Sequence, residues 1–383
     1  MVRLVISALL FLLSLTAVVP AQTINMWRVS VVATGGGHIV ALLALIVLLV
    51  PGWRHSRLGL AAAALSAITL IISLTPVVFA FPVASSLPVR MRTAFGESLP
   101  RSLPGAPPRS RALSVASLYS KIPAPEVTVI TLPYVVRDGT PINLDLYRRD
   151  DSPLPRPIVV TIPGGSWRGG SRTDLAALNR YLAARGYAVA AISYRFAPRY
   201  WYPAQTDDTN AAIDYLKQNA RTLGVDPNMI VLVGRSAGGQ MALQSAYRNN
   251  DPAIRGVVSL YGPTDQLWGW NHPTNPRVYD TPTTLRDFLH GTPAEVPQAY
   301  FESSALNFVG PSTVPTLLIH GGADPLVSLV QSQRLDSALA AAGRPHLLVE
   351  LPWATHACDY VFNGPCAQVA TYAIERFLAS VMN

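Results

Sequence analysis

A serine between glycines is the first group in this chain that could do chemistry. Gly234, Ser236 and Gly238 match the pattern G-x-S-x-G, with apolar residues 230–233 before it and helix-forming residues 240–247 after it. A strand, a sharp turn and a helix in that order would lift the serine hydroxyl clear of a sheet and direct the helix N-terminus at developing negative charge. This context predicts a nucleophile. The alternative is a common glycine-rich loop with an idle serine.

A serine hydroxyl is a poor nucleophile without a base beside it, and the base needs a carboxylate to orient it. Among the seven histidines, His356 follows the last predicted strand in a loop that could reach across the strand ends. Asp324 follows the preceding predicted strand in the same way. Ser236, Asp324 and His356 therefore occur in the order Ser, Asp, His, each after a strand. Taken alone, Asp324 is typical of a turn or helix cap and His356 of a surface loop.

Acyl transfer also needs N–H donors for an oxyanion. The N–H of Ala237, the residue after the proposed nucleophile, is one such donor. The loop at residues 162–167 follows a predicted strand directly, and Gly164 and Gly165 allow its backbone to approach a substrate closely. This loop is expected to supply the remaining donors. The alternative is a plain glycine–proline turn.

The chain from residue 126 onward alternates between strand and helix patterns, and this predicts an α/β fold with a mostly parallel sheet flanked by helices on both faces. Residues 262–312 interrupt the alternation and are expected to form a cap. Aromatic cap residues would line a substrate pocket or form the cap's own core: Trp268, Trp270, Tyr279, Phe288, Tyr300 and Phe301. The expected strands are 127–130, 142–147, 158–162, 187–193, 230–233, 256–261, 316–320 and 346–351, and the expected helices are 174–185, 207–223, 240–247, 328–342 and 367–381.

Residues 126–383 resemble an α/β-hydrolase of the esterase/lipase branch, with an oxyanion loop of the H-G-G-x-W type. The matching segments are 163–170, 194–198, 202–208, 234–239, 261–265 and 320–327. Relatives of this kind include carboxylesterases, acetyl esterases, arylformamidases and prenylcysteine methylesterases. The resemblance implies Ser236 as nucleophile, His356 as base and Asp324 as its orienting carboxylate. It also implies Gly165, Ser166 and Ala237 as oxyanion donors, with Gly164 beside them.

One departure from the family pattern affects the oxyanion loop. The first position of the motif is Pro163, where the family has histidine. The implied donors lie further along the loop, so the oxyanion hole can persist without that histidine. The side chain that would brace the loop is lost, and the fixed φ of proline is expected to stiffen the loop instead.

The first 80 residues hold most of the hydrophobic excess of this 383-residue chain. Apolar runs at residues 4–20, 29–50 and 58–81 predict two or three transmembrane helices, because the first run could equally be a cleaved signal peptide. A Gly-Gly-Gly-His patch at 35–38 interrupts the second run and indicates close helix packing or, alternatively, a functional histidine. Residues 82–125, rich in proline, serine and arginine, predict a linker over the membrane surface, with a short helix at 113–121.

Arg54 and Arg57 in the short loop between two predicted spans place that loop in the cytoplasm. The hydrolase domain would then lie on the extracytoplasmic side, although Arg90 and Arg92 after the last span argue for the opposite orientation. The net charge of +8 is attributed to topology and lipid headgroups, and nucleic acid is not an expected partner.

The two cysteines, Cys358 and Cys366, lie close together near the C-terminus. They suggest a small disulfide-closed loop in an oxidising compartment, and the alternative is two buried thiols. Neither a metal site nor an organic cofactor is expected, since no His/Cys cluster has metal-ligand spacing.

The expected function is cleavage of carboxylic esters by a membrane-anchored serine hydrolase through an acyl-enzyme, with a small-molecule or lipid-like ester as substrate. An acyltransferase, an arylformamidase or a peptidase would use the same three residues. A non-catalytic, membrane-tethered binding protein on the same scaffold is the alternative from another class, and Pro163 is the feature in its favour. The sequence leaves the oligomeric state open.

Overall fold

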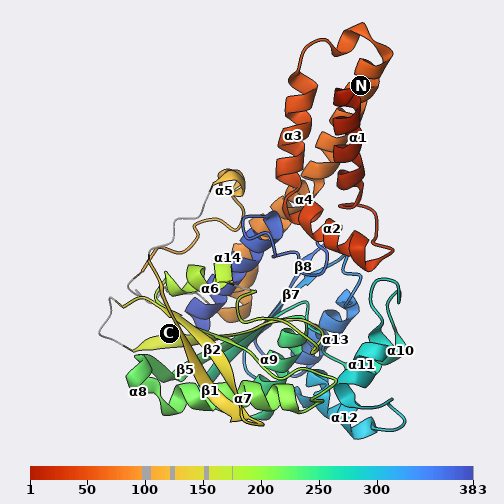
Figure 1. Cartoon of the computed structure of the whole chain (residues 1–383). Helices are drawn as coiled ribbons and strands as arrows, with labels where there is room; N and C mark the ends of the chain where they lie inside the picture. The colour runs from red at the N-terminus through yellow and green to blue at the C-terminus, as the bar shows by residue number, and fades with distance from the viewer. Residues whose placement is uncertain (97–104, 121–125, 151–154, 175, 383) are drawn as a thin grey trace.

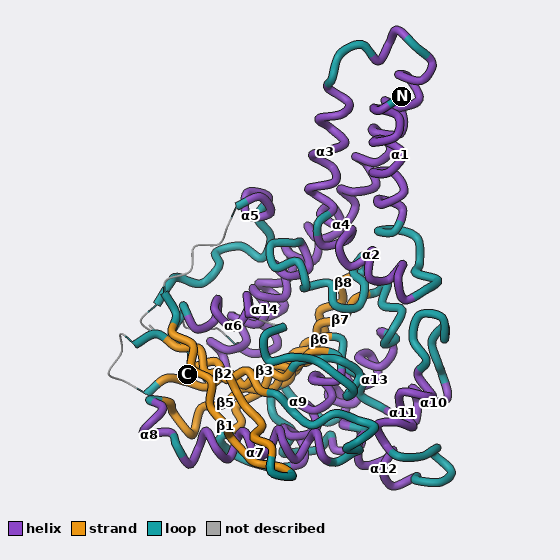
Figure 2. The backbone as a smooth tube through the Cα atoms, in the orientation of Figure 1, coloured by secondary structure: helices purple, strands orange, loops and turns teal. Residues whose placement is uncertain are grey.

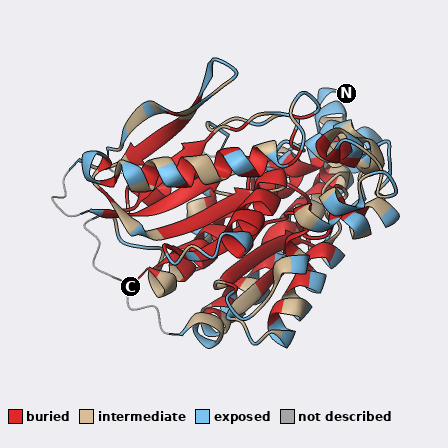
Figure 3. Ribbon diagram, turned by 90° about the horizontal axis from the view of Figure 1, so that it is seen from below, coloured by how far each residue is buried: buried red, intermediate tan, exposed pale blue. Residues whose placement is uncertain are grey.

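The computed structural model describes residues 1–96, 105–120, 126–150, 155–174 and 176–382. Within them, an eight-stranded sheet lies between two layers of helices, and a bundle of N-terminal helices projects from one end of the domain (Figure 1). Figure 2 shows the strands as a continuous band through the domain, and Figure 3 shows that this band and the helix faces against it are buried. The α/β-hydrolase architecture expected from the sequence is present.

The sheet has the order β1-β2-β4-β3-β5-β6-β7-β8. β2 pairs antiparallel with both β1 and β4, and the remaining pairs are parallel. Asp138 and Gly139, both at positive φ, form the tight turn between β1 and β2. The strand bounds are β1 Thr128–Arg137, β2 Thr140–Arg148, β3 Arg156–Ile162, β4 Ala188–Ile192, β5 Val225–Arg235, β6 Ile254–Leu260, β7 Thr316–Gly321 and β8 His346–Leu351.

Successive side chains of each buried strand point to opposite faces of the sheet, so the domain has two cores. On β5, Ile230 and Leu232 join the core with α7, α9 and α13, whereas Val231 and Val233 join the core with α6 and α14. The helices of the domain are α6 Ala176–Ala183, α7 Ala204–Gln218, α8 Ala220–Leu223, α9 Ala237–Arg248, α13 Leu329–Ala341 and α14 Pro365–Val381.

The insertion between β6 and β7, which the sequence predicts as a cap, contains three short helices. It contains α10 Gln266–Asn271, α11 Thr281–Leu289, α12 Pro297–Ser303 and the 3₁₀ turn η2 Ala305–Phe308. The predicted cap aromatics do not share one role. Trp268 and Tyr279 line a cavity, Phe288 and Tyr300 are fully buried in the domain core, Trp270 packs against that core, and Phe301 is exposed.

The N-terminal helices differ from the predicted spans in number and length. They are α1 Val2–Leu15, α2 Ile24–Gly35, α3 Gly37–Leu49 and α4 Arg57–Phe95, with a 3₁₀ turn at Trp53–His55. Among the described residues, α4 is the one helix long and apolar enough to cross a bilayer, and α2 with α3 would count as a second span only if this pair were one span. The predicted single span at 29–50 is instead two helices that meet at Gly36 with a bend of 75°.

Close packing explains the bend. A Cβ on Gly37 would lie 2.5 Å from the carbonyl oxygen of Ser73 in α4, and a Cβ on Gly35 would lie 2.8 Å from the Val361 side chain. A Cβ on Gly364, on the same loop as Val361, would lie 2.5 Å from the carbonyl oxygen of Gly35. The glycine patch therefore lets the α2–α3 bend contact both α4 and the hydrolase domain, in agreement with the close-packing interpretation.

The predicted span at 58–81 lies within a longer helix, because α4 continues to Phe95 through Pro76, Pro82 and Pro88. Its last four turns place Ala80, Ala84, Leu87 and Met91 in one buried stripe against the core that includes α14. This tertiary packing outweighs the lost helix hydrogen bonds that proline normally costs.

The first part of the predicted linker at 82–125 belongs to α4, which ends at Phe95. Residues 97–104 and 121–125 lie outside the described part, and residues 105–120 run over the hydrolase domain. Ala106 donates to the Ala184 carbonyl, and Ser114 donates to Gln368 of α14. The short helix predicted at 113–121 is present as α5 Val115–Tyr119.

Candidate active site

The structure brings Ser236, Asp324 and His356 together at the carboxyl ends of β5, β7 and β8. The Ser236 hydroxyl lies 2.9 Å from Nε2 of His356, and Nδ1 of His356 lies 2.6 Å from Oδ2 of Asp324. These three residues, far apart in the sequence, thus form one continuous hydrogen-bonded chain. In this arrangement His356 can accept the serine proton while Asp324 holds the imidazole.

Ser236 occupies a strained backbone position between β5 and α9. Its φ of 52° and ψ of −122° are rarely adopted by residues other than glycine. The neighbouring glycines make this turn possible: a Cβ on Gly234 would lie 2.0 Å from the Gly238 carbonyl oxygen, and one on Gly238 would lie 2.2 Å from that of Ile162. The sharp turn leaves the hydroxyl exposed to the cavity described below.

Asp324 is held by four donors. Its Oδ1 accepts the backbone N–H groups of Leu326 and Val327, and its Oδ2 accepts His356 and lies 3.3 Å from Nε2 of His320. Burial alone would raise the pKa of Asp324, but the charge of His356 and the hydrogen bonds from both histidines lower this pKa well below the usual range. The carboxylate therefore remains charged even though its side chain is fully buried.

His320 is a residue near the site that the sequence did not assign to it. Its Nε2 lies close to two acceptors, Asp324 and the Val327 carbonyl oxygen at 3.0 Å, so Nε2 carries the proton. Its Nδ1 accepts the Ser332 hydroxyl at 2.7 Å. The sequence signal for this role was its position four residues before Asp324, at the end of the same strand.

The predicted oxyanion loop turns sharply beside Ser236. Gly165, Ser166 and Trp167 all have positive φ, and the Cβ of Ser236 lies 3.0 Å from the place that a Gly164 Cβ would occupy. Among the described residues, none accepts a hydrogen bond from the N–H of Gly165, Ser166 or Ala237. Gly164, Gly165 and Ser166 line the same cavity as Ser236 and His356.

Two aromatic side chains brace this loop, where the family pattern has histidine and this chain has Pro163. The Tyr194 hydroxyl lies 3.0 Å from the Gly169 carbonyl oxygen, with the carbonyls of Pro163 and Gly164 slightly further away. Trp167 donates to Gln240 of α9 and stacks on Phe288 with ring centroids 4.0 Å apart. The loop is therefore anchored to the domain on both sides.

A cavity of about 670 Å³ opens at Ser236 and His356. This volume is in the range of ligand pockets. Its wall includes apolar residues from the cap and from the loop after β7, such as Val278 and Leu326, and it includes Ile24 and Trp27 of α2. The sequence did not predict these two α2 residues as part of the site. A tryptophan next to an apolar run is typical of a membrane interface, but nothing in the sequence relates it to His356.

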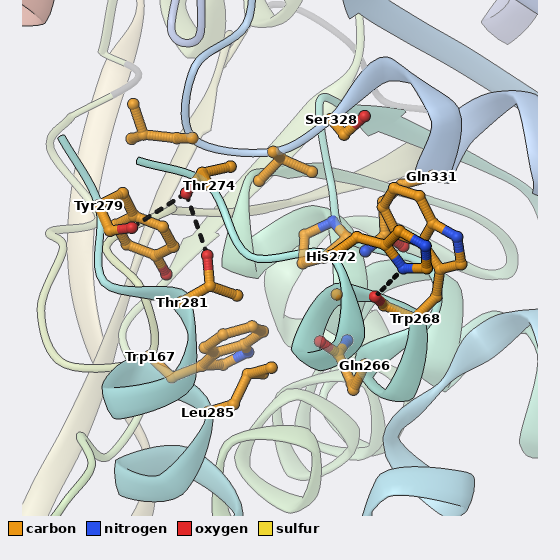
Figure 4. Close-up of a pocket in the computed structure, with 14 residues that line it drawn as sticks. Trp167, Gln266, Trp268, His272, Thr274, Tyr279, Thr281, Leu285, Ser328 and Gln331 are labelled. Atoms are coloured by element: carbon orange, nitrogen blue, oxygen red, sulfur yellow. Dashed lines mark hydrogen bonds between the residues drawn. The ribbon is translucent and has the colours of Figure 1, made fainter. Parts of the chain in front are cut away.

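A smaller cavity of about 40 Å³ lies under the cap (Figure 4). Trp167, Trp268 and Leu285 border it, and it shares Tyr279 and Leu326 with the larger cavity. Figure 4 shows the Thr274 hydroxyl between the Tyr279 carbonyl oxygen and Thr281, hydrogen-bonded to both. These bonds hold the segment that carries Tyr279, which lines both cavities.

The loop after His356 is closed by a disulfide between Cys358 and Cys366. Within this loop, Asp359 forms a buried salt bridge with Arg235, the residue before the serine, and accepts a hydrogen bond from Tyr261 at 2.6 Å. Burial and the nearby charge of Asp359 raise the pKa of Tyr261, so the phenol stays protonated and remains a donor. The turn at Ser236 and the loop after His356 are thereby tied to each other.

Known proteins resemble this chain in sequence and fold. Esterase LipC of Mycobacterium tuberculosis is 31% identical over 255 residues, and esterase LipQ of the same organism is 28% identical over 249 residues. The aligned part is 62% of this chain in both cases, and it covers 62% of LipC and 59% of LipQ, less than two thirds of either. Ethyl acetate hydrolase of Pseudomonas putida is 28% identical over 270 residues, which cover 67% of this chain and 83% of that protein.

Among solved structures, a bacterial heroin esterase superposes with a TM-score of 0.60 at 21% identity, over 70% of this chain and 88% of that one. At this identity the likeness establishes the fold. The family model described as BD-FAE matches residues 144–339, just over half of the chain. The chain belongs to the BD-FAE family and is an α/β-hydrolase of the esterase/lipase type.

Proposed function

We propose that this protein is a membrane-anchored serine hydrolase that cleaves carboxylic esters. The observation that carries the proposal is the hydrogen-bonded chain from Ser236 through His356 to Asp324 at the mouth of a partly apolar cavity. The names of the relatives, esterases and an ethyl acetate hydrolase, support the same chemistry.

The proposed reaction passes through an acyl-enzyme. Oγ of Ser236 attacks the ester carbonyl carbon while its proton moves to Nε2 of His356. The N–H groups of Gly165, Ser166 and Ala237 stabilise the negative oxygen of the tetrahedral intermediate, and Gly164 allows the close approach. The intermediate collapses, the ester C–O bond breaks, and His356 gives its proton to the leaving alcohol. Water then attacks the acyl-enzyme in the same way and releases the acid and free Ser236.

The membrane anchor is part of the proposal. Large apolar side chains are exposed along the projecting helices, including Leu9 and Leu12 of α1, Ile46 of α3 and Ile71 of α4. A surface of this kind is unusual in water and suits a bilayer. α1 and α3 are about 20 Å long, shorter than the roughly 30 Å hydrocarbon core, so we propose that α4 crosses the bilayer and that they pack along it.

The proposed orientation puts the hydrolase domain outside the cytoplasm. Arg3 donates to the Val47 and Leu48 carbonyl oxygens at the end of α3, so it lies with Arg54 and Arg57 at the tip of the bundle away from the domain. Arginines at that end favour a cytoplasmic tip. Arg90, which argued for the opposite orientation, donates to the Leu348 carbonyl oxygen and is held by the domain. A disulfide near the site also suits an oxidising compartment.

Labelling by a serine-directed fluorophosphonate tests the proposed chemistry. The full chain in detergent is treated with the probe beside Ser236→Ala, and hydrolysis of p-nitrophenyl acetate is followed in parallel. We expect labelling and turnover in the wild type and the loss of both in the variant. Folded wild-type protein that neither labels nor hydrolyses the ester would refute the proposal and leave a binding role on this scaffold. Product analysis with an added alcohol separates hydrolysis from acyl transfer.

A further inference from the structure

Helix α2 belongs to the N-terminal bundle by sequence but touches the active-site loops. The Ile24 N–H donates to the Arg277 carbonyl oxygen of the cap at 3.0 Å, and Nε1 of Trp27 donates to the carbonyl oxygen of His356 at 3.2 Å. The Trp27 ring also packs with Val278, Leu326 and Val327. The first turn of α2 is therefore attached to the cap, to the loop that carries Asp324 and to the loop that carries His356.

The same two side chains form part of the cavity wall. Ile24 and Trp27 line the cavity that contains Ser236 and His356, and Tyr360, an aromatic residue that is 73% exposed, lines it as well. Without α2, this wall of the cavity would be missing. The cavity is thus completed by a helix about 210 residues away from the nucleophile in the sequence.

The position of α2 relative to the bundle shows which side of the cavity this wall occupies. α2 joins α1 to α3 at the end of the bundle that meets the domain (Figure 1), and its bend of 75° relative to α3 turns it away from the direction of the spans. With α4 crossing the bilayer as proposed above, a helix in this place would lie where the bilayer surface meets water. Trp27, and Tyr360 at the exposed edge, have the amphipathic aromatic side chains that are enriched at that depth.

We propose that α2 forms the membrane-side wall of the substrate pocket, and that the substrate is an amphiphilic ester with a long hydrocarbon chain, which enters from the bilayer surface with that chain against Ile24 and Trp27. The inference rests on the proposed ester hydrolysis and adds the substrate class and the route of entry. An apolar wall next to the bilayer allows a hydrocarbon chain to pass from lipid to protein without crossing water, and this is the physical reason for the proposed preference.

The test compares a long-chain with a short-chain ester on the full chain reconstituted in phosphatidylcholine vesicles. The substrates are p-nitrophenyl palmitate, carried in the same vesicles, and soluble p-nitrophenyl acetate. Ile24→Ala removes wall surface and leaves the hydrogen bond to the His356 loop in place. We expect the palmitate-to-acetate ratio of kcat/KM to fall about tenfold, because a long hydrocarbon chain buries more surface against this wall than an acetyl group can.

Two further variants make the test specific. Val32→Ala removes a similar apolar side chain from an exposed position of the same helix, away from the cavity, and is expected to leave the palmitate-to-acetate ratio unchanged. Trp27→Phe keeps an aromatic wall but loses the donor to His356, so it is expected to lower both rates together. An unchanged ratio in Ile24→Ala, or an equal fall for both esters, would overturn the inference while acetate turnover still supports the hydrolase. Wild-type protein without labelling or acetate turnover would overturn both this inference and the proposed ester hydrolysis.

Discussion

At the scale of single residues, Asp324 shows how a buried charge is retained. Leu326 and Val327 donate backbone N–H groups to one oxygen, and His356 and His320 donate to the other. These donors replace the hydration that burial removes, so the side chain does not need a proton. His320 is in turn oriented by Ser332. Asp324 Oδ2 therefore contacts a second imidazole besides that of His356.

The lowered pKa of Asp324 predicts a pH dependence of stability. Its folded-state pKa lies below the unfolded value of about 3.9, so its stabilisation is fully present above that pH and is lost as the pH falls towards the folded value. We expect the Tm difference between wild type and Asp324→Asn to shrink as the pH falls below about 4. Thermal unfolding of both proteins across this range measures it. A difference that stays constant into strong acid would contradict the lowered pKa.

The three residues of the hydrogen-bonded chain could be predicted from the sequence because each follows a strand of one parallel sheet. Such strands end at one edge, and this brings Ser236, Asp324 and His356 together across about 120 residues. Trp27 and Ile24 follow no such rule. Their approach depends on how the bundle docks on the domain, and neither periodicity nor spacing encodes that docking.

At the scale of elements, the disulfide loop between β8 and α14 joins three parts of the molecule. It carries Asp359, which pairs with Arg235 beside Ser236, and it packs through Val361 and Gly364 against the bend at Gly35. His356 lies just before it. Movement of this loop would therefore be transmitted both to His356 and to the α2 helix.

Reduction of the Cys358–Cys366 disulfide is predicted to lower both stability and turnover. Closing a loop of this length in the unfolded chain is worth about 2–3 kcal/mol, which reduction would remove from the free energy of unfolding. Thermal unfolding and p-nitrophenyl acetate turnover, with and without dithiothreitol, measure the effect. Cys358→Ser/Cys366→Ser is the control: it should match the reduced wild type and not respond to the reductant. If neither the unfolding temperature nor the turnover changed on reduction, the structural role of the disulfide would be contradicted.

The element boundaries were predictable where local chemistry decides them, and not where tertiary packing does. The turn at Asp138 and Gly139 and the strand–turn–helix at Ser236 lie where the pattern placed them. By contrast, Pro82 and Pro88 signal the end of a helix, yet α4 passes through both. Burial of Leu87 against the domain core stabilises the helix there, and this contact involves residues almost 300 positions away.

At the scale of the whole molecule, α4 is shared by the two halves of the structure. Its first part packs with α1 and α3, and its last turns pack with α14 and β8. Leu87 is fully buried there, whereas Val89 on the same helix is 57% exposed. The N-terminal bundle and the hydrolase domain are thus joined by a packed helix as well as by the covalent chain.

Leu87→Ala is predicted to destabilise the hydrolase domain. Removing this fully buried side chain should cost about 2–5 kcal/mol, because it leaves a cavity in the core formed with α14. Thermal unfolding of the full chain in detergent, monitored through the loss of acetate turnover, measures the change. Val89→Ala, an exposed apolar truncation two residues away, should change the unfolding temperature little. Equal effects of the two variants would show that the end of α4 does not support the domain.

The continuity of α4 has a kinetic consequence for the proposed enzyme. At 1.5 Å per residue the helix is about 58 Å long, nearly twice the hydrocarbon thickness, and its protruding half is embedded in the domain. If α4 crosses the bilayer as proposed, a domain held in this way cannot tumble freely, and the pocket mouth stays at one height above one leaflet. Encounter with a lipid ester is then a two-dimensional search. The velocity follows the mole fraction of ester in the leaflet, and inert lipid slows turnover by surface dilution even when the amount of ester in the sample is unchanged.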